Sequence, residues 1–543
     1  MHLTVLSGGF ALLVVGIDFG TLSARAVVVR VSDGAELGSA SVDYAHGVLE
    51  PEPQWALQVP SDYLEALRAV PLALREAGAV ASDVIGIGTD FTASTVLPVL
   101  EDGTPLSSIS SSPHALVKLW RHHAASSQAA RLNAVCAGEA WMERYGGLTS
   151  AEWEFPKALQ VLEEAPDVYA STGHWAEAAD WIVWQLTGTY VRNACTAGYK
   201  GLYQSGYPSP SLLAQLHPDF ADFAAQKLSA PIVPLGTRVG GLSASGAALT
   251  GLLPGTPVAC GVIDAHATVA AAGAASPGQL VAVMGTSTCH MMVGSSLRPV
   301  PGMCGVVQGG IVPGHWGYEA GQSGAGSILA WYVEHQVPAS YSTRASAEDI
   351  SVHTLLSRLG DGRPVGSHGL VALDWHDGNR SVLVDHALSG VVVGQTLATR
   401  AEDVYRALME ATAFGTLSIV SAFRSSGLEV ESFVAAGGLT QNPVLMQIYA
   451  DVLGMPVSLI GSSEGAALGA AIHGAVAAGA YPSLSEASTA MGSVRRDVYI
   501  PDASRHSAYS RLYDEYVVLH DYFGRGGNSV MHRLRANTSS TPT

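Results

Sequence analysis

The sequence predicts an α/β protein built from two similar domains that face each other. Strand and helix patterns mix along most of the 543 residues, as expected for that class. An apolar strand, a polar bend and a returning strand near residue 20 recur near residue 285, about half a chain later, which indicates an internal duplication. A chain of this length is also too long for a single hydrophobic core.

The composition is that of a folded, acidic protein. Hydrophobic residues make up 48% of the chain and charged residues 14%, which argues against disorder. The formal net charge is −18 at pH 7, and a field of that sign repels nucleic acids and anionic bilayers. We therefore predict neither a nucleic-acid nor a membrane partner, although a local positive pocket could still bind an anionic ligand.

The cysteines and the first residues predict a cytoplasmic protein. The five cysteines have spacings that match neither a disulfide framework nor a metal-binding pair, so we expect reduced thiols. The apolar opening Val5–Val15 has no preceding Lys or Arg and no clear cleavage site. Because it runs into Gly16–Gly20, we interpret it as a buried first strand, and we predict no transmembrane helix elsewhere.

The N-terminal half begins with a hairpin. A strand ends at a polar bend over Asp18–Ser23, and a β-branched strand over Arg25–Val31 returns from it. The periodicity of the following residues predicts further elements: a helix at 62–77, a strand at 83–89, a strand and turn at 95–103, and helical stretches around 114–131, 155–164 and 175–186.

The C-terminal half repeats the opening hairpin. Gln279–Met284 is predicted as a strand, Gly285–Thr288 as a polar bend and His290–Val293 as the returning strand. The remaining pattern predicts the following elements: helices at 328–335, 402–425, 443–453 and 464–478, a strand at 432–436, and a polar excursion that ends near 369.

The domain boundary is predicted close to Ser276-Pro277-Gly278. This gives an N-terminal domain over 1–276 and a C-terminal domain over 277–522. Residues 523–543 are rich in Gly, Ser, Thr and Arg, and we expect a flexible tail there.

The two bends are candidate phosphate-binding elements. In the first, Gly20 lets backbone N–H groups approach an anion, Thr21 adds a hydroxyl donor, and Asp18 could position a metal ion. On its own, this motif is more simply an Asp-Gly hairpin turn. The second bend offers a matching cluster of donors: Gly285, Thr286 and Ser287. Two such bends from facing domains could hold the two ends of a polyphosphate.

A glycine pair at the end of a predicted strand is a candidate for binding a flat group. Gly437 and Gly438 follow Ala435-Ala436 and leave bare backbone for a ring to lie against. Asn442, at a helix start, is equally consistent with a ligand contact and with a helix cap. Neither a Walker motif nor a Rossmann motif occurs, which disfavours those two kinds of nucleotide site.

Three more residues are candidates for the acceptor side of a site. Asp264 follows the predicted strand 257–263 and is either a helix N-cap or a ligand-facing carboxylate. Lys200 is one of only four lysines, which favours a need for a compact point charge, although chance explains it equally. Glu319 is an acidic residue near glycines, and such a residue lies more often in a surface turn than in a binding site. His266 is more simply a helix-face histidine than a ligand, because no metal-binding spacing occurs.

Seven motifs in chain order resemble the FGGY carbohydrate kinases, over roughly residues 14–500. The motifs are Gly16–Thr21, Gly88–Thr92, Lys118–Trp120, Glu177–Gly188, Ala197–Lys200, Met284–His290 and Gln447–Asp451. The resemblance implies two actin-like (ribonuclease H-like) ATPase domains with a cleft between them, which binds ATP and Mg²⁺ on one side and a ketopentose on the other. The implied reaction is ATP-dependent phosphorylation of L-ribulose at its 5-hydroxyl, in L-arabinose catabolism.

The resemblance also implies roles for the residues that match the family's motifs. Asp264 would be the general base, and Asp18 would organise Mg²⁺. ATP would be bound by Gly20, Thr21, Gly285, Thr286 and Ser287 at its phosphates, and by Gly437, Gly438 and Asn442 along its adenosine. The sugar would contact Ala93, Trp120, Lys200, Asp264 and Glu319.

Other interpretations stay open at this point. The substrate could be another ketopentose or a pentitol, such as D-ribulose or xylulose. A non-catalytic nucleotide switch of the actin or Hsp70 kind would keep both bends but would not need a sugar base. Leu22 and Ser327 depart from what the family usually shows, and the first 13 residues exceed its usual start. A homodimer is also left open as the assembly.

Overall fold

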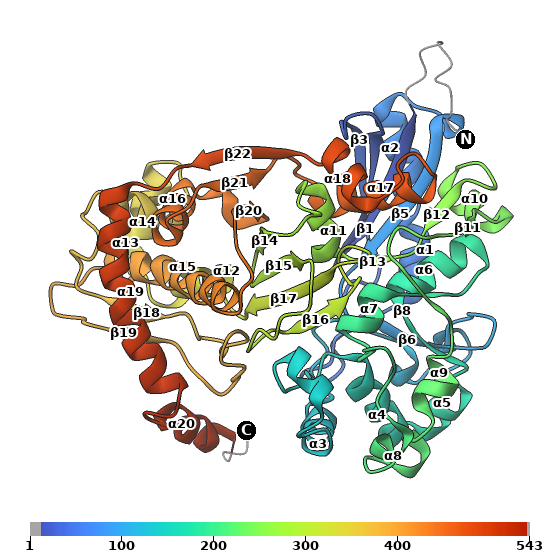
Figure 1. The fold of residues 1–543 in the computed structure, drawn as a ribbon, viewed down its shortest axis with the longest axis horizontal. Helices are drawn as coiled ribbons and strands as arrows, with labels where there is room; N and C mark the ends of the chain where they lie inside the picture. Colours follow the sequence, from blue (N-terminus) through green and yellow to red (C-terminus); the bar gives the residue numbers. More distant parts are fainter. Residues whose placement is uncertain (1–11, 540–543) are drawn as a thin grey trace.

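The computed structural model describes residues 12–539 and has two lobes, each built on a seven-stranded sheet (Figure 1). The N-terminal sheet has the order β11 (Arg238–Gly241), β12 (Pro257–Ala259), β5 (Val84–Phe91), β1 (Leu13–Phe19), β2 (Ser23–Arg30) and β3 (Glu36–Asp43), with β13 (Val262–Ile263) paired to β5. The C-terminal sheet has the order β16 (Gly305–Gln308), β17 (Trp316–Gln322), β15 (Thr288–Gly294), β14 (Gln279–Met284), β20 (Ser432–Ala436), β21 (Val457–Ile460) and β22 (Val494–Tyr499).

The two sheets share their strand order and their strand directions. In the N-terminal sheet, β1 pairs antiparallel with β2 and parallel with β5. In the C-terminal sheet, β14 pairs antiparallel with β15 and parallel with β20. A third strand, β3 or β17, adds antiparallel to each hairpin. This repeat confirms the internal duplication that the two bends predict.

The first strand of each hairpin lies in the middle of its sheet. β1 and β14 are buried along almost their whole length, because helices or the other lobe cover both sheet faces. This is why both sequences are nearly continuous apolar runs instead of alternating patterns.

Helix α17 (Gly465–Ala477) comes from the C-terminal half of the chain but packs on the N-terminal sheet. A Cβ on Gly16 would lie 1.8 Å from the Ala467 carbonyl oxygen, and a Cβ on Gly88 would lie 1.8 Å from that of Ala470. Glycine is therefore required where the helix crosses β1 and β5. Helices α11 (Asp264–Ala271) and α18 (Leu484–Met491) pack against α17, and β22 then returns to the other lobe (Figure 1).

Residues 465–491 thus belong spatially to the N-terminal lobe, although the sequence predicts a C-terminal domain over 277–522. The chain crosses between the lobes more than once, which a single boundary cannot describe. The division at 276 and 277 stays a prediction about sequence segments.

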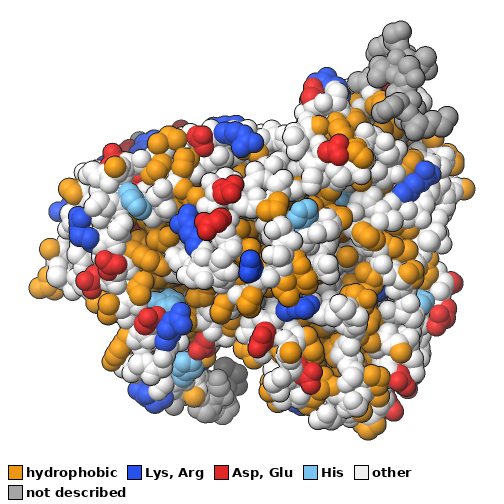
Figure 2. All heavy atoms as spheres, viewed as in Figure 1, with side chains coloured by type: hydrophobic (Ala, Val, Ile, Leu, Met, Phe, Trp, Pro, Cys, Tyr) orange, Lys and Arg blue, Asp and Glu red, His pale blue; other side chains and the backbone are white. Residues whose placement is uncertain are grey.

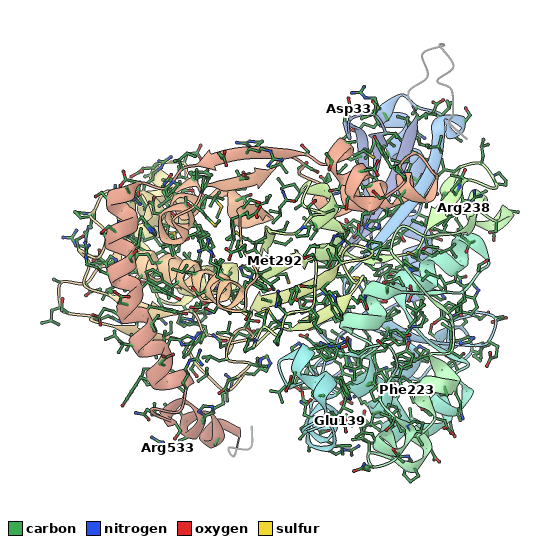
Figure 3. The ribbon with its side chains drawn as sticks, in the orientation of Figure 1. Asp33, Glu139, Phe223, Arg238, Met292 and Arg533 are labelled. Atoms are coloured by element: carbon green, nitrogen blue, oxygen red, sulfur yellow. The ribbon has the colours of Figure 1, made fainter. Side chains whose placement is uncertain are left out.

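A third region, at the lower right of Figure 1, extends the N-terminal lobe. Its small sheet has the order β4 (Leu57–Gln58), β7 (Val117–Lys118), β6 (Val96–Val99) and β8 (His174–Glu177). Phe223, labelled in Figure 3, stacks on Phe220 with ring centroids 4.7 Å apart and meets Phe155 edge-on at 5.0 Å. These rings belong to a separate hydrophobic core of this region.

The helices of the N-terminal lobe and of this third region are α1 (Pro60–Ala66), α2 (Ala69–Ala77), α3 (Ser126–Val135), α4 (Glu154–Glu164), α5 (Pro166–Ser171), α6 (Ala178–Thr187), α7 (Ala194–Tyr199), α8 (Pro210–Leu213), α9 (Phe223–Lys227) and α10 (Ala244–Thr250). A two-stranded sheet pairs β9 (Arg192–Asn193) with β10 (Ile232–Val233).

The C-terminal lobe packs helices around its own sheet. Met292 of β15, labelled in Figure 3, lies in the middle of this core and is 1% exposed. The helices are α12 (Gly326–His335), α13 (Ala339–Ala347), α14 (Val352–Asp361), α15 (Ala401–Ser425), α16 (Pro443–Leu453), α19 (Ala503–Gly524) and α20 (Val530–Ser539), and a small sheet pairs β18 (Val371–Leu373) with β19 (Val391–Val393).

Part of the segment 523–543 is helical in the structure, and its flexibility stays a prediction. Helix α20 spans Val530–Ser539, and Met531 is 4% exposed and packs in the core of the C-terminal lobe. Phe523 and Val530 pack against the same core, so apolar contacts connect this mostly polar segment to the lobe. Residues 540–543 lie outside the described residues.

Three predicted elements of the N-terminal half also differ. The helix predicted at 62–77 is two helices, α1 and α2, and the stretch predicted as helical at 175–186 begins with strand β8. The helix predicted around 114–131 begins only at Ser126, because Val117 and Lys118 form a buried strand that pairs with β4 and β6. Tertiary pairing overrides local periodicity here.

The surface and the thiols agree with the composition. Charged side chains lie scattered among hydrophobic and neutral ones on the face shown in Figure 2. Within residues 12–539, no helix combines the length and the apolar character that crossing a membrane requires. All five cysteines are free. The part of the predicted first strand from Val5 to Ala11 lies outside the described residues.

Candidate active site

A cavity of about 430 Å³ lies where the two lobes meet, and both bends line it. The predicted site residues found in its lining are Asp18, Gly20, Thr21, Ala93, Trp120, Lys200, Asp264, Gly285, Thr286, Ser287 and Glu319. Gly437, Gly438 and Asn442 do not line it. The lining also contains residues that the sequence did not single out as ligands, above all Glu152, His266 and Arg380.

The first bend is fixed from two sides. The Gly20 backbone N–H donates to the Ser23 carbonyl at 3.0 Å, which closes the turn between β1 and β2. Trp120 Nε1 donates to Thr21 Oγ1 at 3.1 Å, and Gln58 Nε2 donates to the Thr21 carbonyl at 2.7 Å. Trp120 is therefore a neighbour of the first bend.

The second bend is also closed by a backbone hydrogen bond, which spans two residues instead of three, and it contacts the start of a helix. The Gly285 backbone N–H donates to the Ser287 carbonyl at 2.8 Å. The Ser327 backbone N–H and Oγ both donate to the Thr286 carbonyl, at 3.1 and 3.0 Å. Ser327, which departs from the family's usual pattern, thus holds the start of α12 against the bend.

The glycine pair lies beside the second bend. Gly437 has a φ of +89°, and a Cβ there would lie 2.6 Å from the Met284 carbonyl oxygen at the end of β14. Gly438 has no atom within 4 Å of an added Cβ, and both glycines are exposed. Open backbone therefore borders the second bend, on the C-terminal lobe.

Asn442 acts as a helix cap in this structure. Its Oδ1 accepts from the backbone N–H groups of Val444 and Leu445 at 3.1 and 3.2 Å, and its Nδ2 donates to Ser357 Oγ at 2.9 Å. The structure therefore shows the helix cap, and the contact with adenosine stays a prediction.

Three carboxyl groups lie close together on the N-terminal side of the cavity. Asp18 and Asp90 are paired in the register of β1 and β5, and Asp90 is also paired with Val262 of β13, just before Asp264. Burial and the charges of Asp18 and Asp264 raise the pKa of Asp90 well above its usual value. Burial also raises the pKa of Asp18, against a hydrogen bond with Asp90 and the charge of Arg25.

Asp264 is a buried carboxyl group at the start of α11 that lines the cavity. Its Oδ1 accepts from the Ala265 backbone N–H at 2.6 Å. Burial, followed by the charge of Asp18, raises the pKa of Asp264 to about 7, although Ala265 and Lys200 oppose the rise. A carboxylate with a pKa near neutrality is well matched to accepting a proton from an alcohol at physiological pH.

Asp18 offers a carboxylate for a divalent cation beside bound phosphates. Within residues 12–539, no group of three or more His, Cys, Asp or Glu is arranged to hold a metal by itself. Mg²⁺ typically binds through one or two carboxylates together with substrate phosphates and waters. Asp18 lines the cavity together with the first bend, which fits such a site.

Glu319 is the centre of a buried charge cluster. Lys200 Nζ donates to both of its carboxylate oxygens at 3.1 Å, and Arg380 Nη2 donates to Oε1 at 2.8 Å. Burial would raise the pKa of Glu319, but Lys200, Arg380 and His266 outweigh it and hold the pKa at about 2. Glu319 is therefore a buried carboxylate and not a surface turn.

Arg380 and Glu152 carried no signal in the sequence. Arg380 comes from the long loop after β18, and a Cβ on Gly321 would lie 2.9 Å from Arg380 Cδ, so glycine makes room for that side chain. Glu152 precedes α4, and its Oε1 lies 3.2 Å from His123 Nε2. His123 and Arg380 lower the pKa of Glu152 to about 2 against burial.

The four lysines all have buried, specific partners. Lys157 Nζ donates to the carbonyls of Ser94 and Leu119 at 2.6 and 2.9 Å. Lys118 and Lys227 donate to one carbonyl each, and Lys200 pairs with Glu319. All four lysines thus have specific protein acceptors, and the need for a compact point charge stays a prediction. Lys157 also supports the turn after Ala93, where Ser94 has a φ of +55°.

The duplicated sheets and the paired bends on one cavity define a two-lobed, actin-like ATPase architecture. The model for the N-terminal domain of the FGGY family of carbohydrate kinases matches residues 13–271, and the model for its C-terminal domain matches residues 280–478. The chain therefore belongs to the FGGY family of carbohydrate kinases.

Several relatives are similar along the whole chain. A ribulokinase of Mycolicibacterium smegmatis is 56% identical, covering 97% of this chain and 96% of its own length. A ribulokinase of Geobacillus thermodenitrificans is 49% identical, covering 96% of each. The crystal structure of a xylulose kinase from Rhodospirillum rubrum has a TM-score of 0.79 at 26% identity and covers 96% of this chain and 100% of its own. A glycerol kinase of Plasmodium falciparum with ADP, with a TM-score of 0.72 at 15% identity over 94% of this chain and 99% of its own, shares the fold alone.

Proposed function

We propose that this protein transfers the γ-phosphoryl group of ATP to the 5-hydroxyl of L-ribulose, giving L-ribulose 5-phosphate and ADP. The proposal is supported by two curated ribulokinases that are 56% and 49% identical to this chain over nearly its full length. The observation that carries the chemistry is Asp264, a carboxylate with a pKa of about 7 in the cavity that both bends line.

Asp264 acts as the general base. The 5-hydroxyl of the sugar is too weakly acidic to ionise in neutral water, so a positioned carboxylate that accepts its proton contributes about 10²–10⁴-fold to the rate. The hydroxyl oxygen forms the new bond to the γ-phosphorus as the bond to the bridging oxygen of ADP breaks, and Asp264 receives the proton. Most of the remaining acceleration comes from alignment and electrostatic stabilisation.

The bends hold the triphosphate from both lobes. Gly20 and Thr21 lie on the N-terminal side of the cavity, and Gly285, Thr286 and Ser287 lie on the C-terminal side. Gly437 and Gly438 border the second bend, where open backbone suits the adenosine. Mg²⁺ bound beside Asp18 would neutralise charge on the phosphate oxygens.

The acceptor side is lined by Ala93, Trp120, Lys200 and Glu319. The turn at Ala93 is held by Lys157, and Trp120 is held by Thr21. Glu319 is ionised and can accept from sugar hydroxyls, while Lys200 and Arg380 can donate to the ketone or to hydroxyl oxygens. Closure of the lobes around the sugar would exclude water, which would otherwise accept the phosphoryl group.

Release of ADP with a panel of sugars tests the proposal. L-Ribulose should be among the best substrates by kcat/KM, ahead of D-ribulose, xylulose and the pentitols. Higher kcat/KM with one of those sugars would keep the kinase chemistry and change the acceptor. ATP binding without sugar-stimulated ADP release would instead support the nucleotide switch, which the buried cluster around Glu319 argues against.

We also propose a cytoplasmic location, which the five free thiols support. A homodimer is proposed as the assembly to test by light scattering of the purified protein.

A further inference from the structure

His266 is a buried imidazole in the cavity that makes no hydrogen bond. It lies on α11, two residues after Asp264, and is 3% exposed. It lines the cavity, and neither Nδ1 nor Nε2 has a hydrogen-bond partner among the described residues. Nε2 lies 3.5 Å from Glu319 Oε2, but the Glu319 carboxylate already accepts from Lys200 and Arg380. Buried polar groups are normally paired, so a partner for this ring is to be expected in the bound state.

The ring is neutral and can pair with an alcohol. Burial, with the positive charges of Lys200 and Arg380, lowers the pKa of His266 to about 4 even though Glu319 opposes the shift. A neutral imidazole has one N–H donor and one acceptor nitrogen, and a sugar hydroxyl has the complementary donor and acceptor. A metal is a poorer match, since no cluster of three or more suitable side chains occurs in the described part of the chain.

A rigid neighbour holds the ring in place. The ring centroids of His266 and Tyr199 are 4.5 Å apart. Tyr199 in turn fills space left by glycines of the C-terminal lobe: a Cβ on Gly305 or Gly317 would lie 2.4 Å from its atoms. The imidazole therefore enters the cavity from a packed, pre-organised position, as a residue that reads a ligand should.

We propose that His266 determines sugar specificity by hydrogen-bonding a hydroxyl other than the one that Asp264 deprotonates. The inference rests on the proposed function and deepens it. Asp264 and His266 line the same cavity from one end of α11. A sugar that presents its reacting hydroxyl to Asp264 has further hydroxyls on the adjacent carbons, within one or two bonds of that position. His266 lines the cavity with both ring nitrogens unpaired among the described residues, as does the Ser94 hydroxyl, and the imidazole offers both a donor and an acceptor to one of these sugar hydroxyls.

The test is a cycle between His266→Phe and deoxy analogues of L-ribulose lacking one hydroxyl at C1, C3 or C4. Loss of the hydrogen bond should lower kcat/KM for L-ribulose by about 10- to 100-fold. For the analogue that lacks the paired hydroxyl, kcat/KM of the wild-type protein should be lower than for L-ribulose by a similar factor. For the same analogue, His266→Phe should lower kcat/KM little further, since the hydroxyl and its partner act as a pair. His266→Asn, which withdraws the polar atoms from the position of Nε2, gives the same comparison if the Phe variant does not fold.

His473→Phe is a matched control. His473 is 1% exposed and burial lowers its pKa to about 4, but it lies on α17 and does not line the cavity. Its substitution should leave the ratio of kcat/KM between L-ribulose and every analogue unchanged. If His266→Phe and His266→Asn lowered kcat/KM by the same factor for L-ribulose and for every analogue, the inference about His266 would be overturned. The proposed function would still stand. If the wild-type protein phosphorylated no pentulose, the proposed function itself would fail, and the inference with it.

Discussion

We expect the loss of activity at acidic pH, the acidic limb of the pH–rate profile, to report the protonation of Asp264. Burial and the charge of Asp18 raise its pKa to about 7, and only the ionised form can accept the proton of the sugar. Activity is therefore lost as the pH falls through this value. At pH 6 about one tenth of the protein has an ionised Asp264, against about one half at pH 7, so kcat/KM should fall about fivefold between them and about tenfold per unit below.

The assay is ADP release at saturating ATP and at L-ribulose concentrations below KM, between pH 5.5 and 8.5. Asp180 provides a control, because burial also raises its pKa to about 7 while Asn193 holds it outside the cavity. Asp180→Asn keeps the acceptor oxygen and should leave the limb in place. A flat profile, or a limb near pH 4, would refute the assignment of the base to Asp264 in this environment.

Three further substitutions probe the supports of the site. Trp120→Phe removes the donor to Thr21 Oγ1 and should raise the KM for ATP by about 2- to 10-fold in ADP-release kinetics. Gly437→Ala places a methyl group 2.6 Å from the Met284 carbonyl at a φ of +89° and should weaken ATP binding, measured by calorimetry, more than Gly438→Ala, which meets open space. Lys157→Met leaves the Ser94 and Leu119 carbonyls without their buried donor and should lower the free energy of unfolding by about 1–3 kcal/mol, with a raised KM for the sugar; an unchanged denaturant midpoint would contradict this.

The sequence allowed the duplicated fold and about half of the cavity lining to be predicted, because that information is local. Each bend joins two strands that are adjacent in the chain, and Gly20 and Gly285 mark where each turn must be tight. Asp264 could be placed for a similar reason, since it directly follows a strand.

The remaining site residues depend on contacts between distant segments. The importance of Asp90 follows from the register of β1 and β5, and Arg380 arrives on a loop whose path the composition does not fix. In the sequence, His266 cannot be distinguished from an ordinary helix-face histidine. Its role becomes visible only because the first residues of α11 line the cavity. Asn442 shows a different limit. A helix cap and a ligand contact both require an Asn at a helix start, so the sequence cannot distinguish them, and the structure shows the cap.

The packing of α17 on the N-terminal sheet escaped prediction for the same reason. Its small residues and the glycines of β1 and β5 are complementary only in three dimensions. The periodicity of 464–478 indicates a helix but does not say which lobe covers its faces.

The most direct measurement compares Asp264→Asn with the wild-type protein for both ATP binding and sugar-dependent ADP release. Two bends that hold the triphosphate independently of the base predict an ATP dissociation constant changed by less than about threefold, together with turnover lowered by at least about 100-fold. Turnover close to that of the wild-type protein would contradict the account, because the cavity would then deprotonate the sugar without its carboxylate.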